Sequence, residues 1–224
     1  MVTILQLSIL VPMVVIWLRK SEFLPAIKLL SWYVYLSAFC ALGGHYTENT
    51  PNALFIIGFS TGKIALFGAV YYMVLESARM RQLVLITTLT AVASCIGLAG
   101  VGCITDFFDI GIAVSRMAQS AVLAAFALVY LEQMLGRANV VSLSRDPIWL
   151  LSVGQLLYSA GTVTAFSLDY LSKTQYEQAP KWIFISVIGI IFNVFLTLAF
   201  LRARNAPRWP VGSNASPVNR LAPV

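Results

Sequence analysis

The sequence has few charged side chains, and this scarcity decides the class of protein. Only 11% of the 224 residues are Asp, Glu, Lys or Arg, whereas 59% are hydrophobic and the mean hydropathy is +0.82. A soluble domain needs about 25% charged residues to keep its surface solvated. The composition therefore excludes an ordinary soluble domain and indicates an integral membrane protein that is surrounded by a lipid bilayer.

Side chains that bind metals or perform catalysis are also scarce. The chain has one histidine, His45, whereas membrane enzymes with zinc or paired iron need several such ligands. The three cysteines have no metal-type spacing, and we interpret them as packing thiols. There is no Gly-x-Ser-x-Gly motif, no cysteine–histidine pair and no pair of carboxylates within an apolar stretch. We therefore expect no enzymatic activity, no bound metal and no cofactor.

Seven apolar stretches follow one another along the chain. A bilayer core is crossed by about 20 apolar residues in helical conformation. Open strands would leave backbone groups unpaired in the hydrocarbon. We therefore predict an all-α bundle of seven transmembrane helices within residues 1–201. The stretches are Val2–Leu18, Ile27–Gly44, Pro51–Leu75, Leu83–Cys103, Ile110–Leu135, Pro147–Leu171 and Lys181–Leu201.

The basic residues predict how this bundle is oriented in the membrane. No basic residue precedes the first apolar stretch, and Arg19 and Lys20 follow it directly, which favours a retained span over a signal peptide. With the N-terminus outside, eleven Lys and Arg residues of the connections and tail fall inside, and only Lys173 and Lys181 fall outside. The positive charge therefore predicts a cytoplasmic C-terminus, and it does not indicate a nucleic-acid partner. Residues 202–224 are predicted to be a disordered basic tail.

Two basic residues lie within the apolar stretches. Counting about 1.5 Å per residue places Lys63 about 18 Å from the outer start of its span, close to the membrane midplane. A lysine at this depth costs roughly 2.5–3.5 kcal/mol on insertion, so Lys63 is a candidate ligand, ion or gating residue. The alternative is a structural lysine that binds helix carbonyls or a buried water. Arg116 lies nearer the outer face, where it could pair with one of the nearby acidic residues or bind an anionic ligand. These acidic residues are Asp106, Asp109 and Asp169.

Neutral polar residues predict a cluster at the depth of Lys63. Tyr158 in the sixth span and Asn193 in the seventh reach a similar level, and Gln155 lies beside Tyr158. We predict a polar site between the third, sixth and seventh spans that binds a small or lipidic ligand. The alternative is that these groups only join helices, because polar and small residues drive helix packing in lipid.

The segment LSRDPIWLLSVGQLLYSAGTVTAF (143–166) and the later segment IFNVFLTLAFLR (191–202) carry a resemblance. They are similar to a poorly characterised group of seven-helix membrane proteins from Bacteroidota. The similarity covers the C-terminal third of the chain, and the remainder agrees only in hydropathy and number of spans. Members of that group are often encoded near sensor kinases, so the resemblance implies a role in sensing with such a partner. The matching residues are Leu143, Asp146, Pro147, Gly154, Leu156, Tyr158 and Gly161.

Three kinds of function stay open at this point. We favour a non-enzymatic sensor or receptor-like protein of a bacterial inner membrane, which binds its ligand in the bundle and signals through a partner. The first alternative is a small transporter or channel with its site around Lys63. The second is a structural or accessory subunit in which the polar residues only pack.

Overall fold

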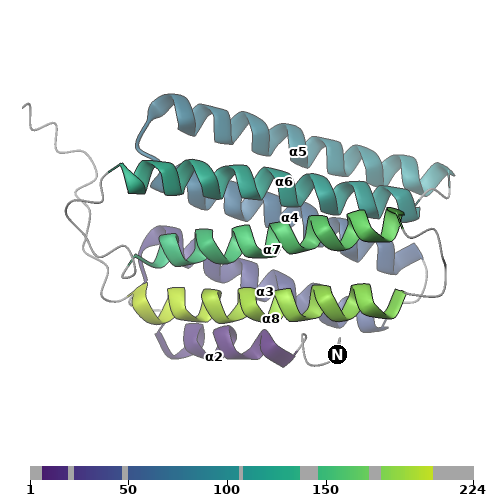
Figure 1. Ribbon diagram of the computed structural model, residues 1–224, viewed down its shortest axis with the longest axis horizontal. Helices are drawn as coiled ribbons and strands as arrows, with labels where there is room; N and C mark the ends of the chain where they lie inside the picture. Colours follow the sequence, from purple (N-terminus) through teal and green to yellow (C-terminus); the bar gives the residue numbers. More distant parts are fainter. Residues whose placement is uncertain are drawn as a thin grey trace, which may run out of the picture.

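A computed structural model describes residues 7–19, 23–46, 50–105, 108–136, 146–171 and 178–203. Within these ranges the regular structure consists of α helices without any strand, which confirms the predicted all-α fold. The helices lie roughly along a common direction (Figure 1). They are α2 (Leu10–Arg19), α3 (Pro25–Tyr46), α4 (Thr50–Val74), α5 (Ala78–Thr105), α6 (Phe108–Leu135), α7 (Pro147–Leu171) and α8 (Gln178–Arg202).

Six of these helices, α3 to α8, are long and apolar enough to cross a membrane, so the chain is a multi-pass membrane protein. The helix α2 is apolar but shorter, and the first residues of the predicted first span lie outside the described residues. A seventh span therefore stays a prediction. The predicted tail lies outside the described residues from position 204 onward.

The helices form a ring with one helix outside it. Each helix of the ring contacts the next one, in the order α2, α3, α4, α6, α7 and α8, and α8 contacts α2. The helix α5 makes its main contacts with α4 and α6 and lies at one edge of the bundle, opposite α2 (Figure 1). Most of its described side chains are exposed, which suits a helix that faces lipid. The interior of the ring is therefore where polar side chains can be enclosed by protein.

Basic residues mark the end of the bundle where α2, α4, α6 and α8 end and α5 and α7 begin, here called the basic end. Arg19 donates a hydrogen bond from Nη1 to the carbonyl of Leu201 at 3.0 Å, which joins α2 to the end of α8. The helix α5 begins at Ala78, earlier than its apolar stretch, because Ala, Arg, Met and Gln all favour helix. The Arg81 guanidinium lies 4.5 Å from the centre of the Tyr72 ring.

The start of α7 has the cap that its sequence predicts. The backbone nitrogen of Ile148 donates to Oδ1 of Asp146 at 2.9 Å, and Pro147 occupies the first helical position, where it needs no donor. The hydroxyl of Tyr130 in α6 donates to the other carboxylate oxygen of Asp146. The Asp146 carboxylate therefore caps α7 and also joins α6 to the start of α7 at the basic end.

Two glycines of α7 set how closely α8 can approach. A methyl group at Gly154 would lie 2.6 Å from Cβ of Phe195, and one at Gly161 would lie 1.9 Å from Cδ1 of Ile188. A side chain at Gly154 would therefore push the two helices apart, whereas one at Gly161 would first meet the flexible end of Ile188. The small residues of this face therefore form part of the contact between α7 and α8.

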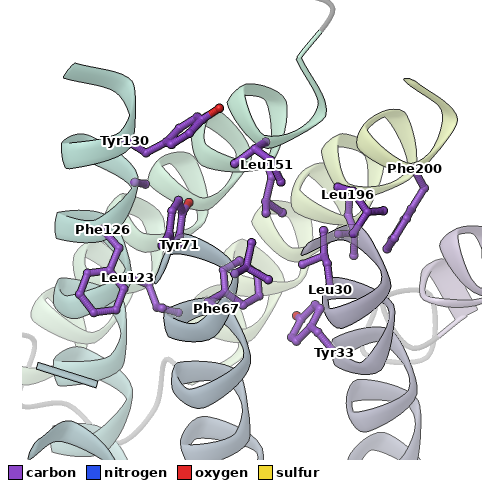
Figure 2. Close-up of a cluster of buried hydrophobic side chains, with 14 of the residues drawn as sticks. Leu30, Tyr33, Phe67, Tyr71, Leu123, Phe126, Tyr130, Leu151, Leu196 and Phe200 are labelled. Atoms are coloured by element: carbon purple, nitrogen blue, oxygen red, sulfur yellow. The ribbon is translucent and has the colours of Figure 1, made fainter. Parts of the chain in front are cut away.

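The apolar core fills the inside of the ring. Figure 2 shows the side chains of Leu30, Phe67 and Leu196, from α3, α4 and α8, directed into the same space. The rings of Tyr33 and Phe67 meet edge to face with centres 5.2 Å apart. Tyr71, one turn beyond Phe67, continues this core toward the basic end.

Candidate functional site

Lys63 lies near the middle of α4, and its side chain is fully buried. Its amine is surrounded by the rings of Tyr33 from α3, Phe67 from α4, Tyr158 from α7 and Phe192 from α8. The distances from Nζ to the ring centres are 3.9 Å for Tyr158, 4.7 Å for Phe192, 5.5 Å for Tyr33 and 5.6 Å for Phe67. We call these four rings the Lys63 cage.

The Lys63 amine has no hydrogen-bond partner among the described residues. The acidic side chains that the structure describes, those of Glu76, Glu132 and Asp146, are all near the basic end. The sequence alternative of a lysine bound to helix carbonyls is therefore not what the described residues show. Cation–π contacts return about 2 kcal/mol when they are desolvated. A lysine at mid-membrane costs roughly 2.5–3.5 kcal/mol, so the rings compensate most but not all of this cost.

The three predicted polar residues of the cluster behave differently. Tyr158 lies beside Lys63, as the similar depth of the two residues predicted, and its ring is the closest of the cage. Asn193 is buried but donates from Nδ2 to the hydroxyl of Ser8 at 2.7 Å, so its amide joins α8 to the segment before α2. Gln155 is fully buried and donates from Nε2 to Ser159 Oγ at 2.9 Å, while its Oε1 has no partner among the described residues.

Arg116 is half-buried in α6, and its guanidinium lies 5.6 Å from the centre of the Phe59 ring in α4. It is near enough to Lys63 for a Coulombic interaction between the two basic groups. The predicted partner of Arg116, the side chain of Asp169, lies outside the described residues, as do those of Asp106 and Asp109. The predicted ion pair therefore stays a prediction.

The structure also identifies buried residues that were not predicted from the sequence. Phe192, rather than its neighbour Asn193, faces the Lys63 amine. In α6, Gln119 and Ser120 are each only 1% exposed, and Gln119 Oε1 and Ser120 Oγ have no hydrogen-bond partner in the described part of the chain. The available signal was a glutamine and a serine in the middle of an apolar stretch. Such residues face protein or a cavity rather than lipid.

No protein-family model matches this chain, and no curated protein or solved structure is significantly similar to it. The function is therefore inferred from the geometry of the bundle. That geometry offers a buried amine, aromatic faces and neutral hydrogen-bonding groups. These groups can bind and orient a ligand by charge, stacking and hydrogen bonds.

Buried aromatic residues connect the Lys63 cage with the basic end. Phe67 and Tyr71 follow Lys63 along one face of α4 at spacings of four residues, and all three are fully buried. The Tyr71 hydroxyl lies 3.0 Å from Ser152 Oγ in α7, and Ser152 in turn donates to the carbonyl of Ile148 at 2.9 Å. Since that bond uses the Ser152 hydrogen, Tyr71 is the donor in the contact between α4 and α7.

Proposed function

We propose that this protein is a non-enzymatic membrane sensor or receptor-like protein that binds a small or lipidic ligand at the Lys63 cage. The observation that carries the proposal is the fully buried Lys63 amine, which has aromatic contacts but no hydrogen-bond partner among the described residues. A ligand acceptor or anion would complete this site. Tyr158 and Gln155 are its proposed polar contacts, and Arg116 is its proposed outer contact.

The position of Lys63 suits a sensor because its neighbours come from four helices. The cage has one ring each from α3, α4, α7 and α8. The amine is fully enclosed, so a bound group has to displace at least one ring, with Tyr158 and Phe192 closest. A ligand shifts a conformational equilibrium only through different contacts in the two states. Displacement of a ring would supply that difference and would move α7 or α8 relative to α4.

The proposed output is at the basic end. Movement of α7 relative to α4 would strain the contact between Tyr71 and Ser152, and that contact lies about two turns from the cap at Asp146. The connections and tail beyond this end are the proposed contact surface for a partner, of which a sensor kinase is the candidate that the resemblance implies. In this proposal the membrane is the cytoplasmic membrane of a bacterium.

The first experiment compares ligands retained by purified protein. Wild type and Lys63→Met are extracted from the same cells in mild detergent, and the bound lipids and small molecules are identified by mass spectrometry. Lys28→Met is the matched control, since Lys28 is an exposed lysine in α3. The proposal predicts a compound that wild type and the control retain and that Lys63→Met loses. Identical retention by all three proteins would contradict it.

The second candidate function is a structural or accessory subunit, and the observation that favours it is the complete enclosure of Lys63 by side chains. In that case the amine would only join helices through its aromatic contacts. A transporter with the same site is distinguished by a different assay. The retained compound, labelled and placed outside proteoliposomes, would accumulate inside only if the protein transports it.

A further inference from the structure

Four buried polar side chains of α4, α6 and α7 share an unusual property. Each is no more than 1% exposed, and each has an atom without a hydrogen-bond partner among the described residues. A buried polar atom without a partner costs about 1–3 kcal/mol, more when it is charged. The atoms are Lys63 Nζ, Gln119 Oε1, Ser120 Oγ and Gln155 Oε1.

Contacts of Tyr71 show which residues of α4, α6 and α7 lie at the same depth in the bundle, here called the Tyr71 level. Its ring centre lies 6.1 Å from that of Phe126 in α6, and its hydroxyl lies 3.0 Å from Ser152 in α7. The helices α4 and α6 both run toward the basic end, and α7 runs away from it. Residues can therefore be counted from the Tyr71 level along each helix.

Counting away from the basic end at about 1.5 Å per residue places the polar groups in one layer. Gln155 lies about 5 Å beyond the Tyr71 level, Gln119 about 10 Å beyond it and the Lys63 backbone about 12 Å beyond it. Tyr158, whose ring is 3.9 Å from the Lys63 amine, is three residues from Gln155 and on the same side of α7. The polar atoms therefore lie in the part of the bundle interior that adjoins the cage.

All four side chains can donate hydrogen bonds into this layer. Lys63 and Ser120 are donors without rearrangement. A half-turn of the Gln155 amide lets its oxygen accept from the Ser159 hydroxyl and directs its nitrogen inward, and a half-turn of the Gln119 amide replaces its unpartnered oxygen with nitrogen. A set of donors around a lysine is suited to an anion.

The charges agree with this assignment. Lys63 and Arg116 are both basic residues, and the described acidic side chains all lie near the basic end. An anion between α4, α6 and α7 would therefore be attracted by two basic side chains and repelled by no described carboxylate. The low dielectric constant of the bundle strengthens that attraction.

We infer that the polar layer formed by Lys63, Gln119, Ser120 and Gln155 is a binding site for a single carboxylate group. A carboxylate has two oxygens with about four acceptor positions, which matches these donors, and it carries one charge. A phosphate with two charges would be more costly to desolvate in the same place. The carboxylate belongs either to a small free acid or to a fatty acid whose chain lies between the helices. This inference rests on the proposed function and names its ligand class.

The experiment measures carboxylate binding to the whole protein in lipid nanodiscs. Radiolabelled acetate tests for a free small acid, and radiolabelled decanoate tests for a fatty acid. The variants are Lys63→Met, Gln119→Leu and Gln155→Leu, with Lys28→Met as the control for loss of a lysine charge. Unfolding temperatures from tryptophan fluorescence confirm that each variant is folded.

We expect saturable binding of one of the two acids by wild type and the control. Lys63→Met should abolish it, and each glutamine variant should weaken it about tenfold or more, because a hydrogen bond to a charged group is lost. Binding of acetate identifies a free acid, and binding of decanoate alone identifies a fatty acid. Absence of saturable binding, or equal binding by wild type and Lys63→Met, would overturn the inference. A neutral compound retained through Lys63 would also overturn it and would leave the proposed receptor function intact.

Discussion

Replacement of Lys63 by methionine should slightly stabilise the protein. The substitution removes a buried amine whose insertion costs roughly 2.5–3.5 kcal/mol, and it loses cation–π contacts worth about 2 kcal/mol. Methionine has a similar length and makes favourable contacts with aromatic edges, so the cage stays filled. The difference predicts a gain of about 1 kcal/mol in the free energy of unfolding.

The gain can be measured by unfolding in mixed detergent micelles, followed by tryptophan fluorescence. Lys28→Met serves as the matched control, because it removes a lysine charge from an exposed position of α3 and should change stability little. Lys63→Ala separates volume from charge. It leaves a cavity among the four rings and should destabilise by about 2 kcal/mol or more.

A loss of more than about 1 kcal/mol in Lys63→Met would refute the reasoning, since the aromatic contacts would then outweigh the cost of the buried amine. The amine would have a structural role, and the second candidate function would be favoured. A gain in stability together with loss of the retained compound would instead separate the role of Lys63 in binding from folding.

Two further substitutions test the contacts of α7. Gly154→Ala should destabilise by about 1–3 kcal/mol, because its new methyl group meets Cβ of Phe195, which cannot move without α8. Gly58→Ala is its control, since nothing lies within 4 Å of the added group, and it should be neutral or stabilising in the same unfolding assay. Tyr130→Phe removes the donor to Asp146 and should cost about 1.5 kcal/mol, the lower end for a charged acceptor because Asp146 is half-buried. An unchanged unfolding midpoint for either Gly154→Ala or Tyr130→Phe would contradict these contacts.

The fold could be predicted from composition because lipid permits few architectures. Long apolar stretches in a chain with little charge leave helices as the spanning structure, and Asp146-Pro147 identified the start of α7. The apolar stretch that begins at Leu83 did not reveal that α5 begins at Ala78, because an apolar stretch shows where lipid begins and a helix can continue past it. The arrangement of the helices, with α5 outside the ring, could not be predicted, because hydropathy does not identify neighbours.

The sequence predicted the depth of the candidate site residues in the membrane, but it did not predict which side of each helix faces the site. Counting residues along two helices brought Lys63 and Tyr158 to the same level, and the structure places them together. Asn193 has the expected depth, yet a turn of about 100° per residue directs its neighbour Phe192 to Lys63 instead. Which of two adjacent residues faces the interior depends on how α8 packs against Gly154, and that contact is visible only in the assembled bundle.

The physical case for a function at this site is that stability does not require a lysine. A methionine would fill the same cage, contact the same rings and avoid the cost of burying an amine. The neutral side chains beside it show the same pattern, because leucine in place of Gln119 or Gln155 would remove an unpartnered oxygen from the core. Three such costs in one layer of three adjacent helices are explained together by a carboxylate that accepts from Lys63 and, once the two amides are rotated, from the nitrogens of Gln119 and Gln155. Packing alone would need a separate reason for each.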